Sequence, residues 1–248
     1  MKIVVGGIIH ERWTIDPYLE AMAKLAHPCE VVFAWVVDGS EELADQLAEH
    51  WWAPSAAVVN VTHLSGTRYT RQANEGEAIY QRMATLRNIL RGLALDLGCD
   101  ALFSVDSDII VPSDVLTKLV ATGKPWVAPL VRNDAEGGNP RGHWNVFKLR
   151  GIERDAGLCD HFRPIGPGFP KEDMIGWDPR DQKKEQCLAA GAVCLYGREL
   201  LEKARWRTDS RGRQEDIGFS IDAFKAGYRA WYIPVQCRHL TVDGLEEA

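Results

Sequence analysis

Short apolar runs alternate with amphipathic stretches through the first half of the chain. The runs predict strands at 2–9 (interrupted by two glycines), 30–37, 56–61, 101–105 and 126–131. The stretches between them predict helices over 18–26, 41–49, 77–97 and 115–121. Between residues 77 and 97 the apolar side chains recur every three or four positions, as in a helix with one buried face. This alternation is typical of an α/β protein with a mainly parallel, doubly wound sheet flanked by helices.

The second half of the chain is less regular. Residues 132–183 are rich in glycine and proline and show little periodicity outside 144–149, so we expect a long, partly irregular loop region there. Order returns at 186–196, and a helix is expected over 198–204. An apolar stripe from Ile217 to Tyr228 then predicts another helix, and 230–235 is the last predicted strand. We expect a single domain over residues 1–248.

Net charge, cysteine spacing and the length of the apolar runs argue against several classes of protein. The 248 residues carry a formal net charge of −6, which argues against a broad nucleic-acid-binding face. The six cysteines are scattered without a C-x-x-C pair, which favours reduced, mostly buried thiols over a disulfide framework or a zinc site. No signal peptide precedes the first strand, and no apolar run approaches the ~18 residues of a membrane span. We therefore expect a cytoplasmic protein without a membrane span.

The sequence Asp106-Ser107-Asp108 directly follows the buried strand at 101–105. Ligands bind at the carboxyl ends of the strands in α/β sheets, and two carboxylates on a turn can converge on one cation. Oxygen ligands suit Mg²⁺ or Mn²⁺, with a substrate diphosphate supplying further oxygens. The simpler interpretation is a turn that leads into the helix after residue 114.

A second acidic pair, Glu215-Asp216, stands immediately before the predicted helix with the stripe from Ile217. It has an ordinary explanation as a helix N-cap, because carboxylates are favoured at the positive end of the helix dipole. It could also supply a general base that takes a proton from an attacking hydroxyl.

Three further residues have positions that suit the same sheet edge. His239 follows the last predicted strand and could complete a metal shell, although a lone histidine is more often structural. Asp38 ends the second strand within an ordinary turn composition, Asp-Gly-Ser, and could accept hydrogen bonds from a nucleobase or ribose. Arg87 is most simply a solvated helix residue but could meet the base or diphosphate of a bound nucleotide.

Four blocks of sequence together resemble the GT-A glycosyltransferases, most closely the family 2 type, and bracket most of the chain outside 132–183. They are Val36–Ser40, Leu86–Asn88 with Phe103–Asp108, Ala189–Leu201, and Glu215–Phe219 with Ala226–Pro234 and His239. The resemblance implies a GT-A fold in which 1–131 binds a nucleotide sugar and 132–248 holds the acceptor and the catalytic base.

The resemblance also implies the chemistry of each site residue. It implies a Mn²⁺ or Mg²⁺ ion on Asp106, Asp108 and His239, nucleotide contacts from Asp38, Arg87, Asp106 and Ser107, and Asp216 as the base, with Glu215 as the alternative. The expected reaction moves a sugar from a UDP- or GDP-sugar to an acceptor hydroxyl with inversion, and retention at the anomeric carbon is the alternative. The acceptor could be a glycan, a protein, a small molecule or a modified nucleic acid. A sugar-1-phosphate nucleotidyltransferase and a non-catalytic nucleotide-sugar- or glycan-binding protein are the alternatives.

Overall fold

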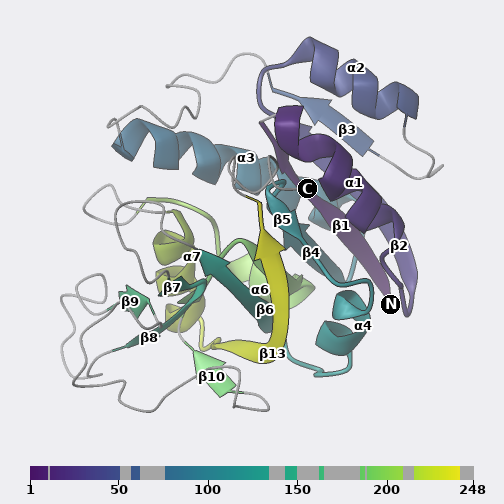
Figure 1. Cartoon of the computed structure of the whole chain (residues 1–248). Helices are drawn as coiled ribbons and strands as arrows, with labels where there is room; N and C mark the ends of the chain where they lie inside the picture. The colour runs from purple at the N-terminus through teal and green to yellow at the C-terminus, as the bar shows by residue number, and fades with distance from the viewer. Residues whose placement is uncertain are drawn as a thin grey trace.

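The computed structural model describes residues 1–10, 12–50, 57–61, 76–133, 143–149, 162–164, 185–187, 189–208 and 215–240. The strands of its main sheet follow the spatial order β10–β13–β6–β12–β4–β1–β2–β3 (Figure 1). Their bounds are β1 Lys2–Ile9, β2 Glu30–Val37, β3 Ala57–Asn60, β4 Ala101–Val105, β6 Trp126–Asn133, β10 Glu185–Cys187, β12 Val193–Gly197 and β13 Ala230–His239.

The sheet is mixed and mainly parallel, as predicted. Strands β3, β2, β1 and β4 run parallel to one another, and β13 runs parallel to β6. Strand β12 lies between β4 and β6 and is antiparallel to both. A short strand, β5 (Ile109–Ile110), pairs with the end of β13, and β7 (His143–Trp144) pairs with the end of β6. Strand β8 (Val146–Leu149) forms a small second sheet with β9 (Phe162–Pro164) and β11 (Ala189–Ala190).

Helices cover both faces of the main sheet. The short 3₁₀ helix η1 (Arg12–Thr14) leads into α1 (Ile15–Ala23), which lies on one face with α2 (Glu41–His50) and α4 (Val115–Val120). The other face is covered by α3 (Gly76–Asp96), α6 (Arg198–Lys203) and α7 (Glu215–Lys225). Among the described residues, no helix combines the length and the apolar character needed to cross a lipid bilayer.

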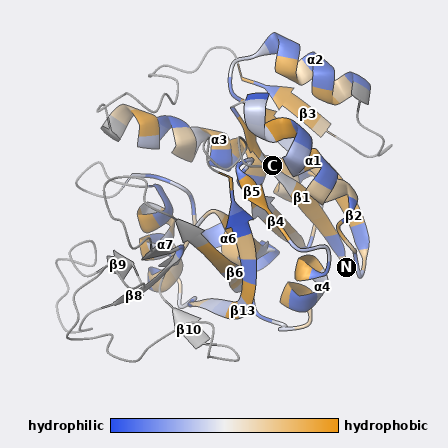
Figure 2. Ribbon diagram, in the orientation of Figure 1, coloured by the Kyte–Doolittle hydropathy of each residue, from blue (hydrophilic) through white to orange (hydrophobic). Residues whose placement is uncertain are grey.

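Helices cover both faces of the sheet, and this explains why its strands are continuous apolar runs in which apolar and polar residues do not alternate. Along β1, Ile3, Val5 and Ile9 pack with α1, α2 and α4, whereas Val4 and Ile8 pack on the side of α3. Both sets of side chains are buried, so neither face of the strand needs polar residues. Figure 2 shows the same distribution, with orange central strands and a mixed blue and orange α2 at the surface.

Strand β1 continues through Gly6 and Gly7, which the sequence suggested as a break. A β-carbon on Gly6 would lie 1.6 Å from the carbonyl oxygen of Ala34, and one on Gly7 would lie 1.9 Å from that of Val105. The two glycines therefore permit close approach of neighbouring backbone within the sheet.

Two boundaries differ from the predicted ones near the sheet edge. Strand β13 runs on to His239 instead of ending at Val235, because its polar residues still pair with β6 and β5. Helix α7 begins at Glu215, so Glu215 and Asp216 form its first turn instead of preceding it. Within 132–183 only 132–133, 143–149 and 162–164 are described, and the rest of the predicted loop region lies outside the described residues.

Candidate active site

The turn after β4 brings Asp108 and His239 together. The backbone N–H of Ile109 donates to the carbonyl of Asp106 at 3.0 Å, which closes the turn. Strand β5 then pairs antiparallel with the end of β13, so that His239 lies opposite Ile109. As a result, His239 Nε2 lies 3.1 Å from Asp108 Oδ2. Burial alone would raise the pKa of Asp108, but the contact with His239 and the charges of His239 and His10 outweigh it and lower that pKa.

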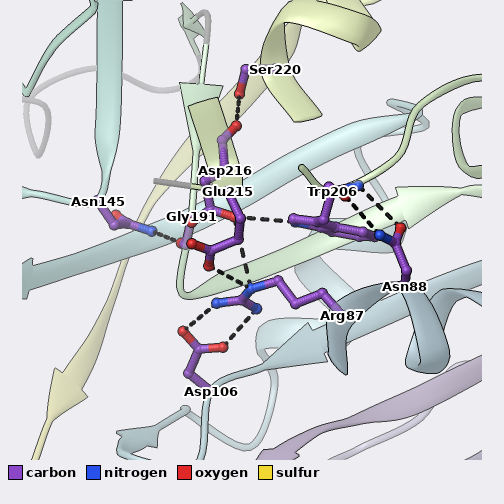
Figure 3. Close-up of polar contacts among 9 residues, drawn as sticks. All are labelled: Arg87, Asn88, Asp106, Asn145, Gly191, Trp206, Glu215, Asp216 and Ser220. Carbon is purple, nitrogen blue, oxygen red and sulfur yellow. Dashed lines mark hydrogen bonds and ion pairs between the residues drawn. The ribbon is translucent and has the colours of Figure 1, made fainter. Parts of the chain in front are cut away.

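Arg87 of α3 lies at the centre of a cluster of carboxylates (Figure 3). It donates two hydrogen bonds to Asp106, from Nη1 at 2.9 Å and from Nη2 at 3.0 Å. Its Nε donates to Glu215 Oε1 at 3.0 Å and lies 4.0 Å from Asp216 Oδ1. Burial disfavours the charged guanidinium, but the three carboxylates raise the pKa of Arg87 well above its usual value. Arg87 is buried, so the solvated position that is usual for a helix arginine does not apply here.

Asp216 is the most strongly perturbed carboxylate of this cluster. Burial is the largest cause, and the negative charges of Glu215 and Asp106 add to it, raising the pKa of Asp216 to about 7. The charge of Arg87 and a hydrogen bond from Trp206 Nε1, at 3.2 Å to Oδ1, act in the opposite direction. The side chain keeps 21% of its surface exposed, so a substrate can still reach it. A carboxylate with a pKa near 7 is suited to general acid–base chemistry.

Asp38 lies at the end of β2 and is held by a second arginine of α3, Arg82. Arg82 Nε donates to Asp38 Oδ1 at 2.8 Å, and Nη2 contacts the same oxygen. Both side chains are buried. The sequence prediction for Asp38 did not include Arg82, because an arginine on an amphipathic helix is normally assigned to solvent.

Only part of the predicted metal shell is assembled by side chains. Asp108 and His239 are in contact, whereas both oxygens of Asp106 receive hydrogen bonds from Arg87. In the described part of the chain, no three His, Cys, Asp or Glu side chains are grouped so as to hold a metal ion. The Asp108–His239 pair does fit a cation that takes its other ligands from a bound diphosphate and water.

Ser107, between the two aspartates, is 1% exposed, and its hydroxyl makes no hydrogen bond with the described residues.

The other residues that the sequence prediction missed surround Asp216. They are Trp206 in the segment after α6, Gly191 before β12, and Asn145 between β7 and β8. A β-carbon on Gly191 would lie 2.2 Å from Asp216 Oδ2. The Asn145 side chain donates to the carbonyl of Gly191 at 2.8 Å. In the sequence, only the pair Gly191-Ala192 before an apolar run pointed to a close approach between this backbone and another group.

Comparison with solved structures identifies the fold. The S. aureus TarS 1-349 structure superposes with a TM-score of 0.58 at 15% sequence identity, covering 100% of this chain and 63% of that one. The same TarS fragment in complex with UDP gives a TM-score of 0.58 at 15% identity, covering 97% of this chain and 61% of that one. The fold is GT-A-like.

A synthetase in complex with CTP has a similar fold. The CMP:2-keto-3-deoxy-manno-octonic acid synthetase complexed with CTP has a TM-score of 0.50 at 14% identity, covering 95% of this chain and 90% of that one. No family model and no curated protein matches the sequence. The chain spans less than two thirds of the TarS fragment. The neighbours of this fold therefore include a protein in complex with UDP and a synthetase in complex with CTP.

Proposed function

We propose that this protein is a glycosyltransferase that moves a sugar from a UDP- or GDP-sugar to an acceptor hydroxyl, with inversion at the anomeric carbon. The observation that carries the proposal is Asp216, a carboxylate with a pKa of about 7 that Arg87 joins to the turn after β4. The GT-A-like fold and the UDP complex of TarS support a nucleotide-sugar donor.

In the proposed reaction, the acceptor oxygen attacks the anomeric carbon while the bond from that carbon to the diphosphate oxygen breaks. The proton of the acceptor hydroxyl passes to the carboxylate of Asp216, and the electron pair of the broken bond leaves with the nucleoside diphosphate. Glu215 is the alternative base, but its Oε1 already accepts a hydrogen bond from Arg87, and this favours Asp216.

The nucleotide would lie over the carboxyl ends of β2 and β4. Asp38 with Arg82, and Asp106 with Ser107 and Arg87, would contact it from these two strand ends. Asp108 and His239 would hold a Mn²⁺ or Mg²⁺ ion, which would supply positive charge to the leaving diphosphate. Residues 132–248 would hold the acceptor, which we leave as a glycan, a protein, a small molecule or a modified nucleic acid.

The second candidate is a sugar-1-phosphate nucleotidyltransferase, which the likeness to the CTP-bound synthetase favours. Such an enzyme would be expected to have a glycine-rich phosphate-binding loop after the first strand. Gly6 and Gly7 lie inside β1 and accommodate the backbone of neighbouring strands, so they do not form that loop. This speaks for the glycosyltransferase.

The first test is thermal stabilisation by UDP and by GDP, each with and without Mn²⁺, on the wild type and on Asp108→Ala. A ligand at a hundred times its dissociation constant adds about 2.7 kcal/mol of stability, which is readily measured. We expect a shift with one of the nucleotides that depends on Mn²⁺ and is lost in Asp108→Ala. Absence of any shift with both nucleotides would contradict the proposed donor class.

The base is tested with Asp216→Asn. The amide cannot take the proton but keeps the size of the side chain, so the variant should keep the nucleotide-induced shift and lose at least 100-fold in sugar transfer. Transfer at the wild-type rate would rule out Asp216 as the base. A protein that shows nucleotide binding but no transfer even as wild type would be a non-catalytic binder.

A further inference from the structure

Asp216 is held from two opposite sides by groups that have no acid–base role of their own. On one side the indole N–H of Trp206 donates to Oδ1 at 3.2 Å. On the other side Oδ2 lies so near Gly191 that a β-carbon there would be 2.2 Å away. Figure 3 shows the carboxylate of Asp216 between these two residues, with Arg87 beneath it. The carboxylate therefore has little freedom to rotate.

Trp206 is itself fixed by hydrogen bonds to its backbone and by two aromatic neighbours of its indole. Asn88 of α3 clamps the backbone of Trp206, donating from its side chain to the Trp206 carbonyl at 2.7 Å and accepting from the Trp206 N–H at 3.1 Å. The ring stacks on Phe219 with centroids 4.3 Å apart and meets Tyr196 edge-on at 5.2 Å. Trp206 is 2% exposed. Its N–H therefore points at Asp216 from a rigid support.

The Gly191 side is supported in a similar way. Asn145 donates from its side chain to the Gly191 carbonyl at 2.8 Å, and the Gly191 N–H donates to the Asn145 carbonyl at 3.1 Å. Asn145 is buried and also accepts a hydrogen bond from the Val131 N–H at 2.8 Å, which ties it to β6. The backbone at Gly191 thus cannot move away from the carboxylate independently of the sheet.

From this arrangement we infer that Trp206 is a positioning residue, whose N–H, opposed by the bare Cα of Gly191, holds the Asp216 carboxylate in one orientation. The inference rests on the proposed function in that it assigns this orientation to the base of sugar transfer. With Oδ1 committed to Trp206, Oδ2 is the oxygen that receives the acceptor proton. Fixing a general base in one rotamer serves catalysis, because the reacting groups then need no reorganisation during the reaction.

The alternative is that Trp206 only fills the core. A hydrogen bond to the charged form of a carboxylate lowers its pKa, whereas ring packing alone does not, and this difference separates the two roles. The charged and titratable groups that face Asp216 are Arg87, Asp106, Glu215, Cys194 and Tyr196. None of them changes in the variants used below.

The experiment follows the carboxyl ¹³C resonance of Asp216 against pH in the whole protein without ligand, with the signal assigned by its loss in Asp216→Asn. In Trp206→Phe a smaller aromatic ring takes the place of the indole and the N–H is gone, so we expect the titration midpoint to rise by about one pH unit, roughly 1.4 kcal/mol. Trp126→Phe is the matched control, because Trp126 belongs to the same aromatic cluster and packs on Phe219 at 5.5 Å. Its midpoint should equal that of the wild type.

Gly191→Ala is a second, independent variant, and it keeps the inference testable if Trp206→Phe does not fold. Its methyl group would push Oδ2 and turn the carboxylate away from Trp206, so the midpoint should again rise. Gly197→Ala is the control, since a β-carbon there would meet its nearest neighbour at 3.4 Å. An unchanged midpoint in Trp206→Phe or in Gly191→Ala, or an equal change in a variant and its control, would overturn the inference. No donor is used, so this result is independent of whether sugar transfer is found.

Discussion

At the scale of single residues, the electrostatics of the candidate site follow from an excess of carboxylates over positive charges. Asp106, Glu215 and Asp216 all lie around the one guanidinium of Arg87. Asp106 takes two hydrogen bonds and Glu215 one, whereas Asp216 is 4.0 Å away. Asp216 is therefore the carboxylate that is least compensated for its burial, and the rise of its pKa to about 7 follows from that.

The raised pKa of Asp216 predicts a specific dependence of stability on pH. A carboxylate whose pKa is higher in the folded than in the unfolded protein contributes stability below its unfolded pKa, and this contribution is lost as the pH rises through the folded value. The wild type should therefore lose roughly 2–4 kcal/mol relative to Asp216→Asn between pH 4 and pH 8.5. Urea unfolding at a series of pH values measures this difference.

The control for this measurement is Asp222→Asn. It makes the same chemical change on α7, but Asp222 lies in a partly exposed pair with Arg207. A difference between the wild type and Asp216→Asn that stays constant with pH would contradict the assignment of the raised pKa.

At the scale of elements, Asn145 joins three segments. Its side chain accepts from Val131 in β6 and donates to the carbonyls of Pro129, also in β6, and Gly191. Asn145 stands between β7 and β8, so it fastens the start of the small sheet to the main one. The turn at Gly191 and Ala192 is also bound to the other side of the site, because Asp106 N–H donates to the Ala192 carbonyl at 2.9 Å.

Asn145→Leu should therefore destabilise the protein by roughly 2–4 kcal/mol, because three side-chain hydrogen bonds to buried backbone groups are lost. Of these groups, the Gly191 carbonyl keeps the hydrogen bond from the Val193 N–H at 2.7 Å. Equilibrium unfolding in urea measures this loss. Thr117→Ala on α4 is the control, because it removes a single exposed hydrogen bond of 3.4 Å and should cost less than 1 kcal/mol. Equal effects of the two substitutions would show that Asn145 is not a structural clamp.

The sequence predicted the helices and strands of the main sheet well where burial is uniform. The apolar runs of β1, β2 and β4 are buried on both faces, so hydropathy alone is enough to predict them as strands. Hydropathy does not encode strand direction, and for this reason the antiparallel insertion of β12 between β4 and β6 was not predicted. Arg82 and Trp206 were missed, because hydropathy does not reveal their contacts with Asp38 and Asp216. Arg87 was predicted as a nucleotide contact, but its hydrogen bonds to Asp106 and Glu215 were not predicted.

At the scale of the whole molecule, Arg87 connects the two halves of the chain that the sequence suggested. It extends from α3, binds Asp106 after β4, and binds Glu215 at the start of α7, which is 128 residues away in sequence. Packing of α3 against α6 and α7 on one face of the sheet brings these segments together (Figure 1). The candidate site thus exists only when both halves are folded against each other.

Arg87→Met should destabilise the protein by roughly 3–5 kcal/mol at pH 8, because it leaves buried carboxylates without a counter-charge. The loss of the guanidinium raises the pKa of Asp216 further, since its charge lowers that pKa in the wild type. The defect should consequently shrink at pH 5, where the carboxylate can be neutral. Urea unfolding at the two pH values tests this.

Arg198→Met is the control for the Arg87 substitution. Arg198 forms an exposed i,i+4 pair with Glu202 at 2.9 Å and donates to the carbonyls of Leu95 at 3.4 Å and Cys99 at 3.2 Å. Its removal leaves no buried carboxylate without a counter-charge, so the defect should be smaller and should not change between the two pH values. A pH-independent defect in Arg87→Met, or one no larger than that of Arg198→Met, would contradict a central electrostatic role for Arg87.

The position of Arg82 and Arg87 on one helix has a mechanical consequence. They are five residues apart, so they are separated by about 7.5 Å along the axis of α3. Arg82 is fastened to the end of β2 through Asp38, and Arg87 to the end of β4 through Asp106. The helix therefore connects the ends of β2 and β4, which lie on either side of β1. A shift of α3 along its axis would strain both ion pairs at once. The ends of β2 and β4 at the site are therefore coupled through this helix.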